Sequence, residues 1–160
     1  APKLLLADEP TTALDASLRT QMLELLGRLQ REHGMALLLI THDLNLVRRV
    51  ADRVAVMYAG EVVEEAAVDA LFHDPRHPYT RALLKTIPSI SGAREARLQV
   101  IEGQPPILND APTACPFRAR CSHAMAICEA ENPARRAIDG APLGHGHDVA
   151  CHWTPEVADA

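Results

Sequence analysis

The fold class follows from residues 4–10, which read Leu4-Leu5-Leu6-Ala7-Asp8-Glu9-Pro10. A short, continuous apolar run that ends in polar residues is typical of a strand buried on both faces. The same pattern returns further along, where the apolar run Met35 to Ile40 ends in Thr41-His42-Asp43. The two runs therefore predict two buried strands, each with polar side chains at its carboxyl end.

Each of these strands is followed by a predicted helix. Apolar residues recur at helical spacing between the strands, at Leu18, Met22, Leu25, Leu26 and Leu29. Asp15 or Ser17 can cap that helix, and Gly34 can end it. Asp43 is placed to cap a second helix, over residues 44–51. This alternation predicts an α/β fold with a largely parallel sheet, in which ligands bind at the carboxyl ends of the strands.

The next part of the sequence predicts antiparallel structure and two short helices. Val54, Val56 and Tyr58 alternate with other residues before a glycine that permits a tight turn, so residues 53–65 are expected to form a β-hairpin. Short helices are expected at 67–72 and at 79–86.

The character of the sequence changes near Ser89. Four prolines fall between residues 103 and 116, and no apolar period survives there. We therefore expect a first domain over residues 1–88 and a Pro-rich extension over residues 89–160.

Composition excludes several classes of protein. The chain has 160 residues, 16 Lys and Arg against 21 Asp and Glu, and a net charge of −5, which argues against nucleic acid as a partner. Its 48% of hydrophobic residues suffices for a core. The longest apolar run, Met35 to Ile40, is too short to cross a bilayer, and no secretory leader is recognisable. Because the chain opens inside a predicted core strand, we expect it to be a fragment of a longer protein.

The two strand ends, together with Ala13-Leu14-Asp15 between them, resemble the second half of an ABC-type ATPase domain. The resemblance implies that Asp8 closes the Walker B strand and helps to hold Mg²⁺ beside ATP, and that Glu9 polarises the attacking water. At the rim of a closed site, we expect the pKa of Glu9 to be raised. The resemblance also implies that Asp15 belongs to the D-loop at the dimer interface, and that His42 is the switch histidine that contacts the γ-phosphate.

Other motifs of that family are missing from the sequence. It contains no G-x-x-x-x-G-K-[ST] phosphate loop, no Ser-Gly-Gly-Gln signature and no Gln-containing loop, all of which precede the Walker B strand in the family. We therefore expect that the chain alone neither binds ATP tightly nor hydrolyses it.

Residues 56–84 narrow the resemblance. The run Val56 to Glu65, then Leu71-Phe72, then His77-Pro78-Tyr79-Thr80-Arg81-Ala82-Leu83-Leu84, is similar to the ATP-binding subunit of oligopeptide, dipeptide and nickel importers. The resemblance implies a second ABC ATPase subunit and two transmembrane permease subunits as partners. It also implies an extracytoplasmic peptide-binding protein as an indirect partner, and a peripheral position on the cytoplasmic face of the inner membrane.

Four cysteines lie in the extension, at Cys115, Cys121, Cys128 and Cys151. From the residues alone, disulfides, a Cys₄ zinc site and an iron–sulfur cluster all remain open, although a reducing compartment disfavours disulfides. The segments around these cysteines, with Gly103-Gln104-Pro105-Pro106, are similar to the C-terminal extension of the peptide-importer ATPases. That resemblance implies a [4Fe-4S] cluster in a structural role, with zinc as the alternative. Nearby histidines, including His147, are expected to be exposed.

Two other functions fit part of the sequence. An ABC ATPase of the DNA-repair type would share the strand-acid and histidine motifs, but it predicts basic patches or coiled-coil insertions, which are absent from the sequence. A free-standing iron–sulfur or zinc-binding regulatory module would leave Asp8, Glu9 and His42 unexplained.

Overall fold

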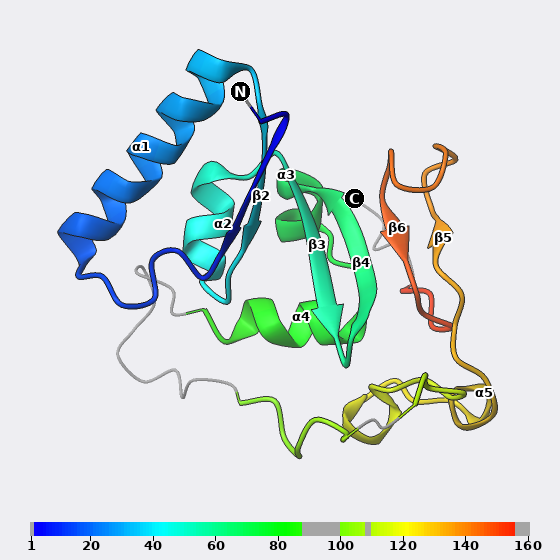
Figure 1. Cartoon of the computed structure of the whole chain (residues 1–160). Helices are drawn as coiled ribbons and strands as arrows, with labels where there is room; N and C mark the ends of the chain where they lie inside the picture. The colour runs from blue at the N-terminus through cyan, green and yellow to red at the C-terminus, as the bar shows by residue number, and fades with distance from the viewer. Residues whose placement is uncertain (1, 88–99, 108–109, 156–160) are drawn as a thin grey trace. The chain divides into compact units, whose positions relative to one another are not determined.

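A computed structural model describes residues 2–87, 100–107 and 110–155, which form mixed α and β structure (Figure 1). The chain divides into two compact units, Ala1–Val50 and Ala51–Ala160. The boundary expected near Ser89 lies outside the described residues. Residues 51–87 belong to the same compact unit as the cysteines. No helix in the described part of the chain is both long and apolar enough to span a bilayer.

The first unit has the expected alternation of strands and helices. Strand β1 (Leu4–Asp8) is followed by α1 (Ala16–His33), β2 (Ala36–Ile40) and α2 (Leu44–Val50). Strands β1 and β2 pair in parallel (Figure 1), and the pairing register places the two carboxyl ends side by side.

Both ends of α1 are fixed by residues that the sequence indicates. The Asp15 carboxylate accepts a hydrogen bond of 2.9 Å from the N–H of Leu18, which satisfies one free donor of the first turn. Gly34 ends the helix with φ 59°, a left-handed conformation that glycine adopts without a Cβ clash. Asp43 caps α2 in the same way as Asp15 caps α1, because its Oδ1 accepts from the N–H of Leu46 at 3.1 Å. These capping predictions are confirmed.

The expectation that both strands are buried on both faces is wrong for the described chain. Along β1 and β2, half-buried residues alternate with exposed ones. Leu4 and Leu6 are 54% and 57% exposed, and Leu38 on the neighbouring strand is 49% exposed. The physical reason is that this sheet has only two strands here, so one of its faces has little to pack against.

The second unit begins with the expected hairpin. Strands β3 (Arg53–Tyr58) and β4 (Glu61–Ala67) are antiparallel and are joined by Ala59 and Gly60. Both loop residues have positive φ, 50° and 82°, which a two-residue loop of type I′ requires. Helices α3 (Val68–His73) and α4 (Pro78–Lys85) follow.

The extension contributes strands that the sequence pattern does not reveal. It contains a 3-10 turn (Arg118–Arg120), α5 (Ala126–Ala130), β5 (Arg136–Ala137) and β6 (Asp148–Val149). Strand β6 pairs antiparallel with β4, and the strand order is β3-β4-β6-β5 (Figure 1). The hairpin is therefore the first half of a sheet that the extension completes.

An aromatic cluster joins the extension to the hairpin and to α4. Phe117 is 2% exposed. Its ring centroid lies 5.2 Å from that of Tyr58 on β3, in an edge-to-face arrangement, and 5.4 Å from that of Tyr79 on α4. Such pairs are favourable beyond the area that they bury, so Phe117 is an anchor of the second unit.

Buried polar groups of the second unit are joined across long stretches of sequence. Glu64 on β4 is fully buried, and it accepts hydrogen bonds from the N–H of Arg76 and of His77. His147 lies 2.7 Å away through its Nε2. Burial opposes the charge of Glu64, but these hydrogen bonds outweigh burial, so the pKa of Glu64 is lowered. The expectation that His147 is exposed is wrong, because this ring closes the contact between β4 and the residues before β6.

His77 begins α4. Its Nδ1 accepts from the N–H of Tyr79 at 3.0 Å, and Pro78 takes the first helical position. Burial lowers the pKa of His77 to about 4, an effect that the charge of Glu64 partly offsets. The ring is therefore neutral near pH 7 and its Nδ1 can accept this hydrogen bond. The short helix expected at 79–86 is therefore present, and it begins one residue earlier, at Pro78.

Candidate functional site

The polar ends of β1 and β2 meet in the first unit. The N–H of Glu9 donates to the carbonyl of Ile40 at 2.9 Å, which joins the two strand ends directly. Asp8 is opposite Ile40 in the pairing register. Because the strands are parallel, the residues that follow them, Glu9 and His42, lie at the same edge of the sheet.

Glu9 and His42 form the centre of this site. His42 Nδ1 lies 2.8 Å from Glu9 Oε1, and the hydroxyl of Thr12 donates to Glu9 Oε2. Glu9 has φ 46°, which is uncommon for a residue other than glycine. The side chains are 38% exposed for Glu9 and 76% exposed for His42, so the pair is open to a ligand.

The pKa of Glu9 is lowered, which corrects the expectation that it is raised. The hydrogen bond from Thr12 has the largest effect, and the hydrogen bond from His42 adds to it, because both stabilise the charged carboxylate. Burial that would raise the pKa is slight at this open edge. Glu9 is therefore ionised near pH 7, and His42 Nδ1 carries the hydrogen of their contact.

The two other predicted residues of the ATPase motifs lie around this pair. The carboxylate of Asp8 is exposed and has no hydrogen-bond or ion-pair partner among the described residues. Asp15 serves as the cap of α1, and nothing in this chain tests its predicted place at a dimer interface. The roles of Asp8, Glu9, Asp15 and His42 toward ATP stay predictions.

Two residues of this edge were not identified from the sequence. Thr12 holds the carboxylate of Glu9, as described above. Arg19 on α1 pairs with Asp43 at 3.1 Å and also donates to the carbonyl of Leu14, so it ties α1 to the start of α2. The helical position of Arg19, next to the predicted cap Asp15, is the one sequence signal that could have found it.

The four cysteines lie together in the second unit, and all are free thiols. The N–H of Cys115 donates to the carbonyl of Cys128 at 3.0 Å. The N–H of His123 donates to the thiol of Cys121 at 3.4 Å, and the N–H of Arg118 donates to the carbonyl of Cys115 at 3.2 Å. The backbone N–H of Trp153 lowers the pKa of Cys151 slightly, against the larger effect of burial.

Burial raises the pKa of three of these thiols. The pKa of Cys151 is raised to about 11, chiefly by burial, with smaller contributions from the charges of the other three cysteines. The pKa values of Cys115 and Cys121 are raised by burial as well. In the described part of the chain, no group of three or more Cys, His, Asp or Glu side chains is arranged to hold a metal ion. The prediction of a [4Fe-4S] or zinc site is therefore not supported by this geometry.

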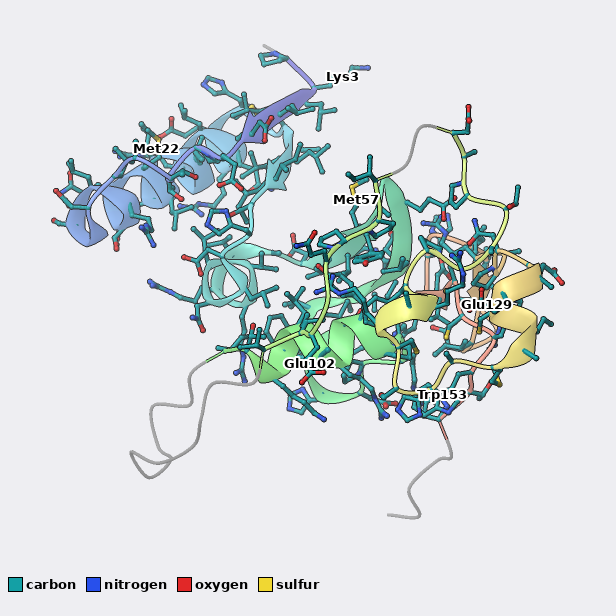
Figure 2. All side chains as sticks on the ribbon, turned by 90° about the horizontal axis from the view of Figure 1, so that it is seen from below. Lys3, Met22, Met57, Glu102, Glu129 and Trp153 are labelled. Atoms are coloured by element: carbon teal, nitrogen blue, oxygen red, sulfur yellow. The ribbon has the colours of Figure 1, made fainter. Side chains whose placement is uncertain are left out.

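Arg118 and Arg120, near two of these cysteines, have structural partners. Arg118 donates hydrogen bonds to the carbonyl of Cys115 and to the carboxylate of Glu129 on α5. Glu129 is labelled in Figure 2. Arg120 donates to the carbonyls of Ile101 and Glu102. Arg118 thus holds the backbone at Cys115, and Arg120 holds the backbone of residues 101–102.

Comparison with known proteins finds similarity to peptide-transport proteins. A model described as "Oligopeptide/dipeptide transporter, C-terminal region" matches residues 63–128. The dipeptide transport ATP-binding protein DppD of Escherichia coli K12 is 47% identical over 152 residues, which cover 95% of this chain and 45% of the relative. Over most of its length, this chain is similar to the ATP-binding proteins of ABC peptide importers. The resemblance stated from the motifs is confirmed.

Other peptide-importer proteins match in the same way. The oligopeptide transport ATP-binding protein OppD of Bacillus subtilis 168 is 50% identical over 132 residues, which cover 82% of this chain and 37% of the relative. A putative peptide import ATP-binding protein of Brucella ovis is 44% identical over 162 residues, which cover 98% of this chain and 46% of the relative. The chain spans less than half the length of these curated relatives.

Proposed function

We propose that this chain forms the hydrolytic edge of the ATP site in an energy-coupling subunit of a peptide importer. The contact of 2.8 Å between His42 and Glu9, at the joined ends of two parallel strands, carries the proposal. It puts an ionised carboxylate and an imidazole beside each other at the sheet edge where α/β folds bind ligands. The names of the relatives support the substrate class.

The three polar side chains have separate tasks in this proposal. Glu9 accepts a hydrogen bond, and then the proton, from the attacking water. His42 holds Glu9 through Nδ1, which leaves its Nε2 free to face the terminal phosphate. Asp8, whose carboxylate has no partner in the described part of the chain, suits the water ligands of a magnesium ion. Bound Mg-ATP supplies the phosphoryl group and the neutralising cation.

The rest of the assembly is inferred from the relatives. A phosphate-binding loop is absent from this sequence, so we propose that residues outside it complete the ATP site and that this chain alone does not hydrolyse ATP. Two ATPase subunits would close on ATP and drive two permease subunits at the cytoplasmic face of the inner membrane. The peptide would arrive from an extracytoplasmic binding protein.

Uptake by cells tests this function and the site together. A strain that lacks the protein should lose uptake of labelled di- and oligopeptides, and the wild-type gene should restore it. We expect the His42→Ala gene to restore less than about a tenth of the wild-type rate, because the base Glu9, whose positioned proton transfer contributes about 10²–10⁴-fold, loses the contact that holds it.

The control for that experiment is His33→Ala, which removes an exposed histidine at the end of α1. It should restore uptake fully. Normal uptake with His42→Ala would refute the role of His42. If the strain that lacks the protein loses uptake of nickel but keeps normal uptake of peptides, nickel would replace peptide as the proposed substrate.

We also propose that the four cysteines ligate a metal centre in the assembled protein, a [4Fe-4S] cluster with zinc as the alternative. All four thiols are close enough to influence one another's charge, and Cys121 accepts a hydrogen bond from the N–H of His123, which favours the thiolate. A bound metal cation would stabilise the negatively charged thiolates, which burial otherwise disfavours.

Anaerobic purification followed by iron, sulfide and zinc analysis tests the metal centre. We expect about four iron and four sulfide per chain, with loss of most of the iron on Cys121→Ser. Ser122→Ala, an exposed neighbour that is not a ligand, is the matched control and should keep the metal. Zinc without iron would favour the alternative, and a chain free of both metals would refute the proposal.

A further inference from the structure

A small pocket of the second unit is lined by cationic side chains. Its volume is about 180 Å³, and it lies between α4, residues 100–101 and residues 122–123. Arg81, Lys85 and His123 line it together with the hydroxyl of Ser122, and no carboxylate is among its lining residues. The remaining lining is apolar and comes from Pro78, Ala82, Val100 and Ile101.

Arg81 is held in place while part of its guanidinium stays free. Its Nε donates to the carbonyl of Pro75 at 2.9 Å. Its guanidinium carbon lies 5.1 Å from the ring centroid of Trp153, within the range of a cation–π interaction. The ring of His123 is stacked on the same indole at 4.0 Å. The two terminal nitrogens of Arg81 have no hydrogen-bond partner among the described residues. They can therefore donate hydrogen bonds to an anion without breaking an existing contact.

Lys85 adds a second uncompensated charge. It lies one turn after Arg81 on α4, on the same side of the helix, and its side chain is exposed. It has no ion-pair partner in the described part of the chain. Helix α4, Pro-Tyr-Thr-Arg-Ala-Leu-Leu-Lys, contains no acidic residue, so its own side chains do not neutralise this pair.

We propose that this pocket binds a small phosphorylated anion. Two fixed positive charges and a histidine favour a dianion, and the planar fork of arginine suits the oxygens of a phosphoryl group. Since one water occupies about 30 Å³, the pocket has room for a phosphoryl group and a few further atoms. Pro78, Ala82 and Ile101 would contact the apolar part of such a molecule. The inference uses only residues of the second unit and does not depend on the proposed ATPase role.

Trp153, which is labelled in Figure 2, makes the test simple, because it is the single tryptophan of the chain. Its ring is in contact with both Arg81 and His123. The 160-residue chain is titrated with sodium phosphate and, separately, with O-phosphoserine, while tryptophan fluorescence is recorded. Sodium chloride at matched ionic strength and disodium succinate serve as comparison ligands. We expect a saturable change with both phosphate compounds at millimolar concentration or below, and no saturable change with chloride.

Two variants connect the signal to the pocket. Lys85→Gln removes an exposed charge that has no ion-pair partner among the described residues, and it should weaken phosphate binding about tenfold without affecting folding, because a charge-assisted hydrogen bond to the anion is lost. Arg81→Lys keeps the positive charge but removes the planar guanidinium group. We expect it to weaken phosphate binding to a similar degree. The matched control is Arg28→Gln, at an exposed position of α1, which should bind phosphate as the wild type does.

Three results would overturn the proposal. They are an unsaturable response that chloride reproduces, tighter binding of succinate than of phosphate, and unchanged phosphate affinity in Lys85→Gln. Thermal melts of each variant, followed through Trp153, identify any loss of folding, and Lys85→Gln remains decisive if Arg81→Lys fails to fold.

Discussion

Replacement of Glu9 by glutamine is expected to lower ATP turnover by about 10²–10⁴-fold in a protein that joins this chain to a phosphate-binding loop. Glutamine has nearly the same shape, and its carbonyl oxygen can still accept from His42. It cannot accept the proton of the attacking water, so the chemical step should fail while the site keeps its form. ATP affinity should therefore stay within a few-fold of the wild-type value.

Phosphate release and equilibrium binding of ATP, measured on the same preparation, check this expectation. Glu24→Gln is the matched control, because Glu24 is exposed on α1 and makes the same change of charge in the same unit. Only the Glu9 variant should lose turnover. Hydrolysis at the wild-type rate by Glu9→Gln would refute its assignment as the base, and an equal loss of ATP binding would assign Glu9 to binding instead.

Truncation of Phe117 to alanine is expected to cost about 3–5 kcal/mol of the free energy of unfolding of the second unit. The ring is 2% exposed and contacts the rings of Tyr58, Tyr79 and His77. Removal of the ring would leave a cavity between segments that are distant in sequence. These segments cannot easily move together to fill that cavity.

Urea unfolding followed by the fluorescence of Trp153, which belongs to the same unit, measures the change. Ile107→Ala is the control, because that side chain is 94% exposed and its truncation should cost less than about 0.5 kcal/mol. A loss below about 1 kcal/mol for Phe117→Ala would show that the aromatic cluster does not hold the extension to the hairpin.

The elements with local signals were predictable from the sequence. The strands ending near Asp8 and Ile40, helix α1 with its caps, and the hairpin at Gly60 each depend on the spacing of nearby residues, and all are present. Strands β5 and β6 were not predictable, because each has only two residues and a period-2 pattern cannot be recognised over that length. Their existence depends on pairing with β4, which is a property of the fold.

The candidate site, like the fold, has features that the sequence predicts and others that it does not. That Glu9 and His42 lie close together follows from parallel strands whose carboxyl ends share an edge. The direction of the pKa shift of Glu9 could not be predicted, because it depends on where the hydroxyl of Thr12 points. The partnership of Glu64 with His147 crosses 83 residues, and no local pattern in the sequence indicates it.

The late position of β6 has a consequence for the synthesis of this protein on the ribosome. Val149, which pairs with Glu64 on β4, is added 85 residues after it, which takes about 4–17 s at roughly 5–20 residues per second. During that time the hairpin can form, but one edge of β4 has no partner strand and the Glu64 carboxylate has no His147. An open strand edge of this kind is a hazard for aggregation. During this interval the nascent chain is prone to aggregate through the open edge of β4 unless another molecule covers that edge. A messenger RNA that ends before β6 would leave the edge of β4 open permanently.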